Sequence, residues 1–169
     1  SKERKVSFFL WYLFRALKTA NELVNFKYRI IDGLPVAYDT INASPTINRL
    51  DGTFGFAYFD YYADENDFYY HAQNEIKKVQ QSTVLIPSKS EENLIHFSAL
   101  PWIDFTSISH ARNYSASDSC PKISFGKMTE NNGIMTMPVS IHVHHALMDG
   151  YHVAQFIDKF QKLMNEDIA

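Results

Sequence analysis

The chain has 169 residues, of which 46% are hydrophobic and 15% aromatic, so its composition excludes an intrinsically disordered protein and its length suits one domain with a sizeable core. The formal net charge is -3 at pH 7 and the lysines and arginines form no dense block, which argues against a nucleic-acid surface because phosphate binding needs concentrated cations. A single cysteine, Cys120, excludes an intramolecular disulfide and a multi-cysteine zinc site, and it fits the reducing cytoplasm.

The first predicted element is a helix over residues 6–23. The basic residues before it and the apolar run over 6–14 are similar to a signal peptide, but the run is too short to span a bilayer. Apolar residues then recur at helical spacing, at Leu10, Leu13 and Leu17. We therefore expect a buried amphipathic helix and neither a leader nor a membrane span.

A hairpin is predicted next. The segments Tyr28–Ile31 and Pro35–Tyr38 flank Asp32-Gly33, a pair that supplies the positive φ angles of tight hairpin turns. The two segments are therefore expected to pair with each other as antiparallel strands.

An aromatic strand and a second helix follow. Thr53–Tyr61 places Phe54 and Phe56 on one face and small residues on the other, so this face is either core or the wall of a pocket. Glu65–Gln81 is predicted to be a helix, because acidic residues in its first turn suit the positive end of the helix dipole. Ser88–Glu92 is expected to form a polar loop.

The second half of the chain is predicted to be mostly strands, at Leu94–Leu100, Ile103–Ile108, Lys122–Met128 and Met135–His145. A turn at Asn131–Gly133 leads into the last of these strands. After Gly150, apolar residues at three- and four-residue spacing indicate a C-terminal helix with one apolar face. The pattern as a whole predicts an α+β fold in which a few helices pack on one sheet.

Two adjacent histidines at the end of the last predicted strand are the main candidates for chemistry. His145 shares its side of the strand with apolar residues such as Val139 and Val143, so it is expected to point inward. Burial disfavours the charged form of a histidine, which would keep His145 neutral and able to accept a proton.

Three interpretations of this segment stay open from the residues alone. His145 could be a general base, with Asp149 supporting the local backbone. His142, His144 and Asp149 could instead bind a metal ion. In the third interpretation His145 is a satisfied core histidine, and Asp149-Gly150 caps a helix.

Two segments resemble the chloramphenicol acetyltransferase family. His144–Gly150, with Met137–Val143 before it and Tyr151–Val153 after it, resembles the active-site segment of that family. Ser98–Ser107 resembles the segment that opens with the family's active-site serine, and the two segments lie in register with the family pattern. Weaker likenesses at 32–33, 53–54 and 121–127 extend the resemblance over nearly the whole chain.

The resemblance implies a two-layer sandwich with a mixed, mainly antiparallel sheet and helices packed on one face. It also implies a homotrimer with each active site between subunits, acetyl-CoA as cosubstrate with no permanently bound cofactor or metal, and acetyl transfer to a hydroxyl of chloramphenicol or a similar small alcohol. No nucleic acid or membrane partner is expected. The 13 Phe, 10 Tyr and 2 Trp independently favour association, because aromatic residues are enriched at interfaces.

Roles for three catalytic residues and one structural residue follow from the same resemblance. His145 would be the general base that deprotonates the acceptor hydroxyl, and Ser98 would donate a hydrogen bond to the oxyanion of the tetrahedral intermediate. Ser124 stands where the family commonly has threonine, which helps to stabilise that intermediate through water. Asp149 would have a structural role, since the family pairs this acid with an N-terminal arginine. No matching arginine precedes Ser1, so residues 1–169 are expected to form a single acetyltransferase domain that lacks an N-terminal segment of the family fold.

The resemblance also indicates residues of the two substrate sites. Phe54 aligns with an aromatic residue of the acceptor pocket, and Phe56 stands where a small residue is usual, so the pocket is expected to be narrower. Lys127 aligns with a lysine on the coenzyme A side, and Met128 replaces a common tyrosine there. Two alternatives remain: a lipoyl-type acyltransferase core and a non-catalytic trimeric module that binds a ligand.

Overall fold

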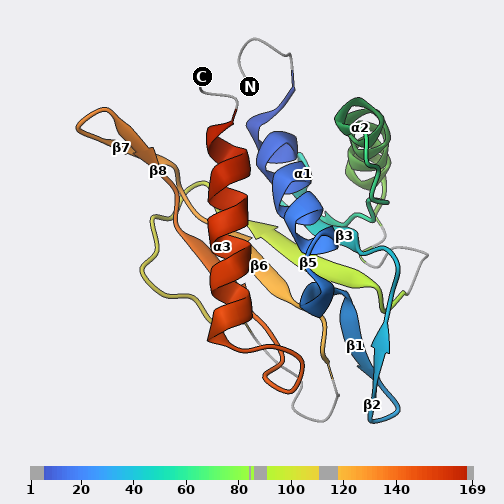
Figure 1. The fold of residues 1–169 in the computed structure, drawn as a ribbon. Coiled ribbons are helices and arrows are strands. Elements are labelled where there is room, and N and C mark those ends of the chain that lie inside the picture. The colour runs from blue at the N-terminus through green and yellow to red at the C-terminus, as the bar shows by residue number, and fades with distance from the viewer. Residues whose placement is uncertain (1–5, 84, 86–90, 111–117, 167–169) are drawn as a thin grey trace.

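Within the described residues, three α-helices cover one face of a five-stranded sheet (Figure 1). The computed structural model describes residues 6–83, 85, 91–110 and 118–166. The helices are α1 (Phe8–Asn21), α2 (Glu65–Gln81) and α3 (Gly150–Asn165), and a short 3-10 helix (Val24–Lys27) follows α1. All three predicted helices are therefore confirmed. The predicted polar loop Ser88–Glu92 and the basic residues at the amino terminus lie wholly or mostly outside the described residues.

The central sheet has the strand order β4-β3-β5-β6-β9. Its strands are β3 (Asn42–Asn48), β4 (Phe54–Phe56), β5 (Leu94–Ala99), β6 (Lys122–Phe125) and β9 (Val139–His142). β5 pairs in parallel with both β3 and β6, whereas β4 and β9 run antiparallel at the two edges. The predicted α+β sandwich with a mixed sheet is confirmed, and parallel pairing is confined to the centre of the sheet.

Two antiparallel hairpins lie outside this sheet. One consists of β1 (Tyr28–Ile31) and β2 (Leu34–Ala37), and the other consists of β7 (Thr129–Asn131) and β8 (Ile134–Thr136). The first hairpin turns at Asp32 and Gly33, with φ angles of 49° and 79°, which confirms the prediction from the Asp-Gly pair. Figure 1 shows β7 and β8 projecting away from the helices.

Aromatic contacts hold the helices on the sheet. Phe125 of β6 contacts Tyr12 of α1 with ring centroids 4.5 Å apart and Phe160 of α3 at 6.0 Å. Phe14, on another side of α1, lies 5.3 Å from Phe68 of α2. Because α1 lies between its two neighbours as well as on the sheet, it is buried almost all round, and Leu13 is 0% exposed. It is therefore more deeply buried than an amphipathic surface helix.

The strand β3 was not predicted from the sequence, because its polar residues and Pro45 do not alternate with apolar ones. Pro45 has no N–H group, but its carbonyl accepts a hydrogen bond of 2.9 Å from Ala57. The missing donor faces the β4 side, and the regular pairing of β3 with β4 ends there. Beyond this point only an isolated bridge joins Ala43 to Phe59. The predicted strand Thr53–Tyr61 is therefore reduced to the three-residue β4.

The predicted strand Ile103–Ile108 is wrong. β5 and β6 pair directly with each other, which leaves no position in the sheet for a strand between them in sequence. The chain turns after β5, where Ile103 donates a backbone hydrogen bond to Leu100 (3.0 Å), and then crosses the end of β6, where Lys127 donates to Ile103 (2.8 Å). β-branched composition favours a strand only where a partner edge is available.

Candidate functional site

Three serines form a row across the sheet. Ser98 of β5 is the register partner of Ser124 of β6, which in turn is the register partner of Ser140 of β9. Alternate residues such as Phe97 and Ile123 face the helices and are buried in the core, so the serines lie on the opposite face. The fold thus places Ser98 and Ser124, which were predicted as site residues, side by side.

A histidine that was not predicted as a site residue completes this polar row. The Nε2 atom of His110 lies 3.1 Å from Oγ of Ser124, whose side chain is 0% exposed. The ring of His110 also meets the ring of His142 edge to face, with centroids 5.1 Å apart. Two imidazoles from different parts of the chain therefore lie on the same face of the sheet as the serines.

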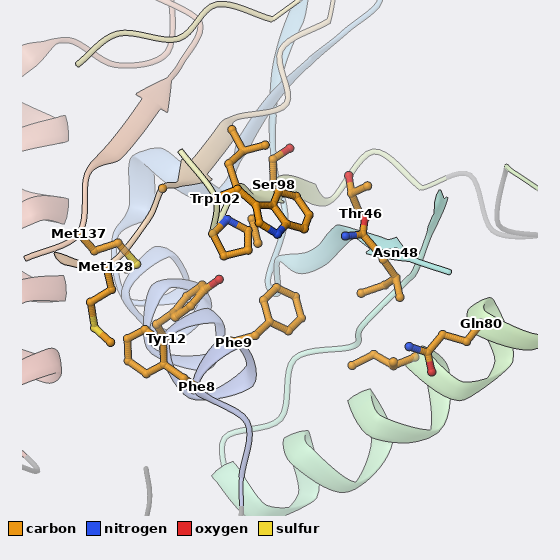
Figure 2. Close-up of a pocket in the computed structure, with 16 residues that line it drawn as sticks. Phe8, Phe9, Tyr12, Thr46, Asn48, Gln80, Ser98, Trp102, Met128 and Met137 are labelled. Carbon is orange, nitrogen blue, oxygen red and sulfur yellow. The ribbon is translucent and has the colours of Figure 1, made fainter. Parts of the chain in front are cut away.

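A pocket of about 490 Å³ opens where β3 and β5 end (Figure 2). Ser98 lies at one side of it, beside Trp102, and Phe8, Phe9 and Tyr12 of α1 form the opposite wall. The other lining residues are also uncharged: Thr46, Ile47, Asn48, Ile76, Gln80, Ala99, Leu100, Pro101, Gly126, Met128 and Met137. A mostly apolar pocket with a few hydroxyl and amide groups suits an uncharged, elongated ligand segment.

Gly126 lines this pocket, and because it has no side chain, the backbone of Ile103 and the ring of Pro138 can lie close to it. A Cβ atom added there would lie 2.8 Å from the carbonyl oxygen of Ile103 and 2.6 Å from Cγ of Pro138. Backbone cannot yield easily, so we expect Gly126→Ala to lower the free energy of unfolding by about 1–3 kcal/mol. Urea denaturation would measure this loss. Gly150→Ala is a suitable control, because an added Cβ atom there meets nothing within 4 Å, and equal stability of the two variants would contradict the prediction.

His145 lies beyond the end of the last strand and is exposed in the single chain. β9 ends at His142, and a turn follows in which Leu147 donates a 2.9 Å backbone hydrogen bond to His144. Strand alternation therefore does not reach His145, and the prediction that it points inward with Val143 is wrong for the chain by itself. The exposed position leaves the imidazole accessible to a molecule or a second chain.

One contact determines which nitrogen of His145 can act as a base. Nδ1 lies 3.3 Å from the backbone oxygen of Met148. A carbonyl oxygen can only accept a hydrogen bond, so Nδ1 carries the proton, and Nε2 of the neutral ring then has a lone pair. This is the tautomer that can accept a proton from a hydroxyl at Nε2.

Ser98 and His145 lie at opposite ends of the sheet. Because β9 runs antiparallel to β6, residues after Ser140 move toward the amino-terminal ends of β5 and β6, where Lys122 pairs with His142. Ser98, in contrast, lies near the carboxyl-terminal end of β5. Figure 1 shows the loop before α3 at the end of the molecule away from the tip of β5. A single chain therefore does not bring these two residues together.

Asp149 is the N-cap of α3. Its carboxylate accepts hydrogen bonds from the backbone of Tyr151 (3.0 Å) and His152 (3.4 Å), and the His152 ring lies 2.8 Å away. Desolvation opposes ionisation, but the hydrogen bonds from His152 outweigh it and lower the pKa of Asp149. His152 thus contacts Asp149 where the family resemblance implied an arginine.

This cap leads to a prediction about acid stability. The pKa of Asp149 is lower in the folded than in the unfolded state, so its ionised carboxylate stabilises the folded state at pH values above the unfolded pKa. This stabilisation is lost as pH falls through the folded pKa. Asp149→Ala should lower Tm by about 2–4 °C at pH 7, and the difference from the wild type should shrink below about pH 4. Asp149→Ser, which keeps a capping oxygen, is the matched control in thermal denaturation. A pH-independent difference would contradict the prediction.

Phe54, Phe56 and Lys127, the remaining predicted site residues, do not line the pocket. Phe54 and Phe56 of β4 contact each other edge to face at 5.7 Å, and Phe54 is 45% exposed. Their register with β3 puts them on the same face of the sheet as Ser98. Lys127 is exposed just beyond the end of β6, and its neighbour Met128 lines the pocket.

The described residues hold no group of three or more His, Cys, Asp or Glu side chains that could bind a metal ion. His142 contacts Ser140, His144 accepts a hydrogen bond from the backbone of Ala146, and Asp149 caps a helix. The metal interpretation thus gains no support from this part of the chain. None of the helices described has the length and apolar character required to cross a membrane.

Comparisons with known proteins agree on one family. A family model described as chloramphenicol acetyltransferase matches residues 1–161. A chloramphenicol acetyltransferase of Clostridium perfringens is 32% identical over 130 residues, which are 75% of this chain and 58% of the relative. One from Escherichia coli is 27% identical over 157 residues, which are 89% of this chain and 72% of the relative. The chain thus spans about three fifths to three quarters of the length of these two relatives.

Solved structures agree with the sequence matches. A structure named chloramphenicol acetyltransferase is 31% identical and superposes with a TM-score of 0.80, covering 93% of this chain and 77% of that chain. A dihydrolipoamide acetyltransferase of Azotobacter vinelandii, at 16% identity, has a TM-score of 0.70 and covers 94% of this chain and 68% of its own. This second likeness concerns the fold alone.

The fold is an α+β sandwich of the acyltransferase type. It carries Ser98 on β5 and His145 in the turn before α3. The chain belongs to the chloramphenicol acetyltransferase family, as the match over residues 1–161 shows. The family predicted from the sequence is thereby confirmed, and the relatives are named for an enzyme activity.

Proposed function

We propose that the protein is an acetyl-CoA-dependent O-acetyltransferase that acetylates a hydroxyl of chloramphenicol or a similar small alcohol. The observation that carries this proposal is the exposed His145 ring, whose Nδ1 atom donates to a backbone carbonyl so that Nε2 is available as a base. Family membership supports the same chemistry. The reaction uses acetyl-CoA as a cosubstrate and no permanently bound cofactor, and the single Cys120 fits a cytoplasmic protein.

The reaction begins when Nε2 of His145 removes the proton of the acceptor hydroxyl. The oxygen attacks the thioester carbonyl carbon, and the carbonyl oxygen becomes an oxyanion. Ser98 donates a hydrogen bond to this oxyanion, and Ser124, on the neighbouring strand, supports the same intermediate. When the intermediate collapses, the carbon–sulfur bond breaks, the coenzyme A thiolate takes the proton from His145, and the acetyl ester leaves.

Assembly of several chains is part of this proposal. Ser98 and His145 lie at opposite ends of the sheet in one chain, so a site that uses both takes them from two chains. A homotrimer with three equivalent sites between subunits satisfies this requirement with a closed symmetry. β9 lies at an edge of the sheet, next to the segment that carries His145.

The two substrates occupy different parts of this site. We assign the acyl-pantetheine arm of acetyl-CoA to the uncharged pocket beside Ser98, because Lys127 lies just outside it and carries a charge that suits a phosphate. The acceptor contacts Phe54 and Phe56, whose rings narrow the space available to it.

The test measures thiol release from acetyl-CoA with and without chloramphenicol. Chloramphenicol-dependent release, with the acetyl ester identified by mass spectrometry, would support the proposal. Acceptor binding in isothermal titration calorimetry without turnover would instead favour the non-catalytic trimeric module. Turnover with dihydrolipoamide and none with chloramphenicol would favour the lipoyl-type acyltransferase core, which the fold likeness to the Azotobacter vinelandii structure keeps as the second candidate.

A further inference from the structure

The imidazole of His110 contacts a buried serine next to the proposed oxyanion donor. We propose that His110 is a positioning residue, which donates a hydrogen bond to Ser124 and so directs the hydroxyl proton of Ser124 toward the Ser98 side of the site. This inference rests on the proposed acetyl transfer. Its basis is the 3.1 Å distance between Nε2 of His110 and Oγ of Ser124, and the register pairing of Ser124 with Ser98.

The direction of this hydrogen bond decides what Ser124 can do. A serine hydroxyl has one proton to donate and lone pairs that accept. If Nε2 of His110 carries a proton, Ser124 accepts from it and keeps its own proton for another acceptor. If Nε2 is unprotonated, the Ser124 proton points to His110, and Ser124 has no proton with which to support a negative charge. Stabilisation of an oxyanion therefore requires the Nε2–H form of His110.

The proton of Ser124 can reach the neighbourhood of Ser98. Adjacent strands lie about 4.8 Å apart, so two serines in register on one face are within reach of each other directly or through one water. Ser124 is 0% exposed and Ser98 is partly buried, which keeps competing solvent away from this pair. A hydroxyl oriented in such an environment gives a stronger hydrogen bond than it would in water.

Another group near His110 restricts its orientation. The ring of His142 meets it edge to face at 5.1 Å, which disfavours rotation of the His110 ring away from Ser124. His110 therefore lies between the ring of His142 and the row of serines that includes Ser124.

A different chemistry would use the same two residues as a nucleophile and its base. In that case His110 would accept the Ser124 proton and Ser124 would attack the thioester to form an acyl-enzyme. The position of Ser124 argues against it, because Ser98 and not Ser124 lines the pocket assigned to the thioester. An acetyl group found on Ser124 by mass spectrometry would overturn the donor direction proposed here.

The kinetic test compares His110→Leu, His110→Gln and the exposed neighbour Ser109→Ala as a control, all in the full chain. We expect His110→Leu to lower kcat about fivefold to tenfold, with KM for acetyl-CoA and chloramphenicol within about twofold. His110→Gln, whose side-chain amide can donate from a similar position, should restore most of kcat, and Ser109→Ala should match the wild type. His110→Leu should add no further loss to Ser124→Ala, since both changes remove the same hydrogen bond.

The outcomes separate this inference from the proposed function. An inactive wild type contradicts the acetyl transfer itself, whereas an active wild type with an equally active His110→Leu variant overturns only the role of His110. Nitrogen NMR of the wild-type histidines gives a readout that needs no variant to fold. A proton on Nε2 of His110 supports the donor direction, and a neutral ring protonated only at Nδ1 overturns it.

Discussion

Replacing His145 by alanine is expected to lower kcat by about 10²–10⁴-fold, because a positioned base contributes roughly that factor. The loss should appear in kcat and kcat/KM together, since proton removal occurs only in the transition state. Stability should change little, because His145 is exposed and its Nδ1 atom contacts only the local backbone, at the oxygen of Met148. Steady-state thiol release at saturating substrates measures the first effect and thermal denaturation the second.

His144→Ala is the matched control for this prediction. His144 is the adjacent exposed histidine, and its ring contacts only the local backbone at Ala146 among the hydrogen bonds described. The control should retain most of the activity. If His145→Ala turns over as fast as the control, the imidazole of His145 is not the base, and the mechanism proposed above fails.

Replacing Ser98 by alanine is expected to lower kcat by about 10²–10³-fold, since the loss of one oxyanion donor has this effect in other enzymes. The loss should be no larger than that of His145→Ala. Ser98 lies beside the pocket assigned to the thioester, so a modest rise in KM for acetyl-CoA is also expected. Ser107→Ala, an exposed serine on the following loop, is the control, and full activity of Ser98→Ala would remove it from the site.

Mixing the two inactive variants tests whether the site is shared between chains. When Ser98→Ala and His145→Ala chains are unfolded together and refolded as a mixture, some sites combine an intact Ser98 from one chain with an intact His145 from another. Activity should then return, although each variant refolded alone stays inactive. No recovery, with mixed assemblies detected by mass spectrometry, would mean that both residues of each site come from one chain.

The sequence predicted the elements that depend on local patterns. The helices α1, α2 and α3 and the turn at Asp32-Gly33 follow from apolar spacing, capping and φ preferences, all of which act over a few residues. The strand β3 was missed and the strand at Ile103–Ile108 was predicted wrongly for one reason. Whether a segment forms a strand depends on an available partner, and β3 accommodates Pro45 because its missing N–H lies on the β4 side, where the regular pairing ends.

The site residues that lie within a recognisable sequence motif could be predicted from the sequence. Ser98 and Ser124 were predicted separately, and their pairing follows from the register of β5 and β6, which no local pattern reveals. His110 gave no signal, because its contact with Ser124 depends on the loop after β5 folding back over the sheet.

Arg29 is a further example of a feature that depends on tertiary contacts. Its side chain is 0% exposed, and its guanidinium donates to the backbone oxygens of Phe26, Tyr28, Glu92 and Leu94. Burial lowers its pKa. The sequence shows only a charged residue within a predicted strand, and it does not show that four carbonyl groups, two of them distant in sequence, surround its guanidinium.

The separation of Ser98 from His145 along the sheet has a consequence for newly made protein. Under the proposed mechanism, a folded chain that has not assembled carries Ser98 at one end of the sheet and His145 at the other, and it has no catalytic activity. Activity then increases more steeply than linearly with chain concentration, until nearly all chains are assembled. Dilution would abolish the activity while each chain stays folded.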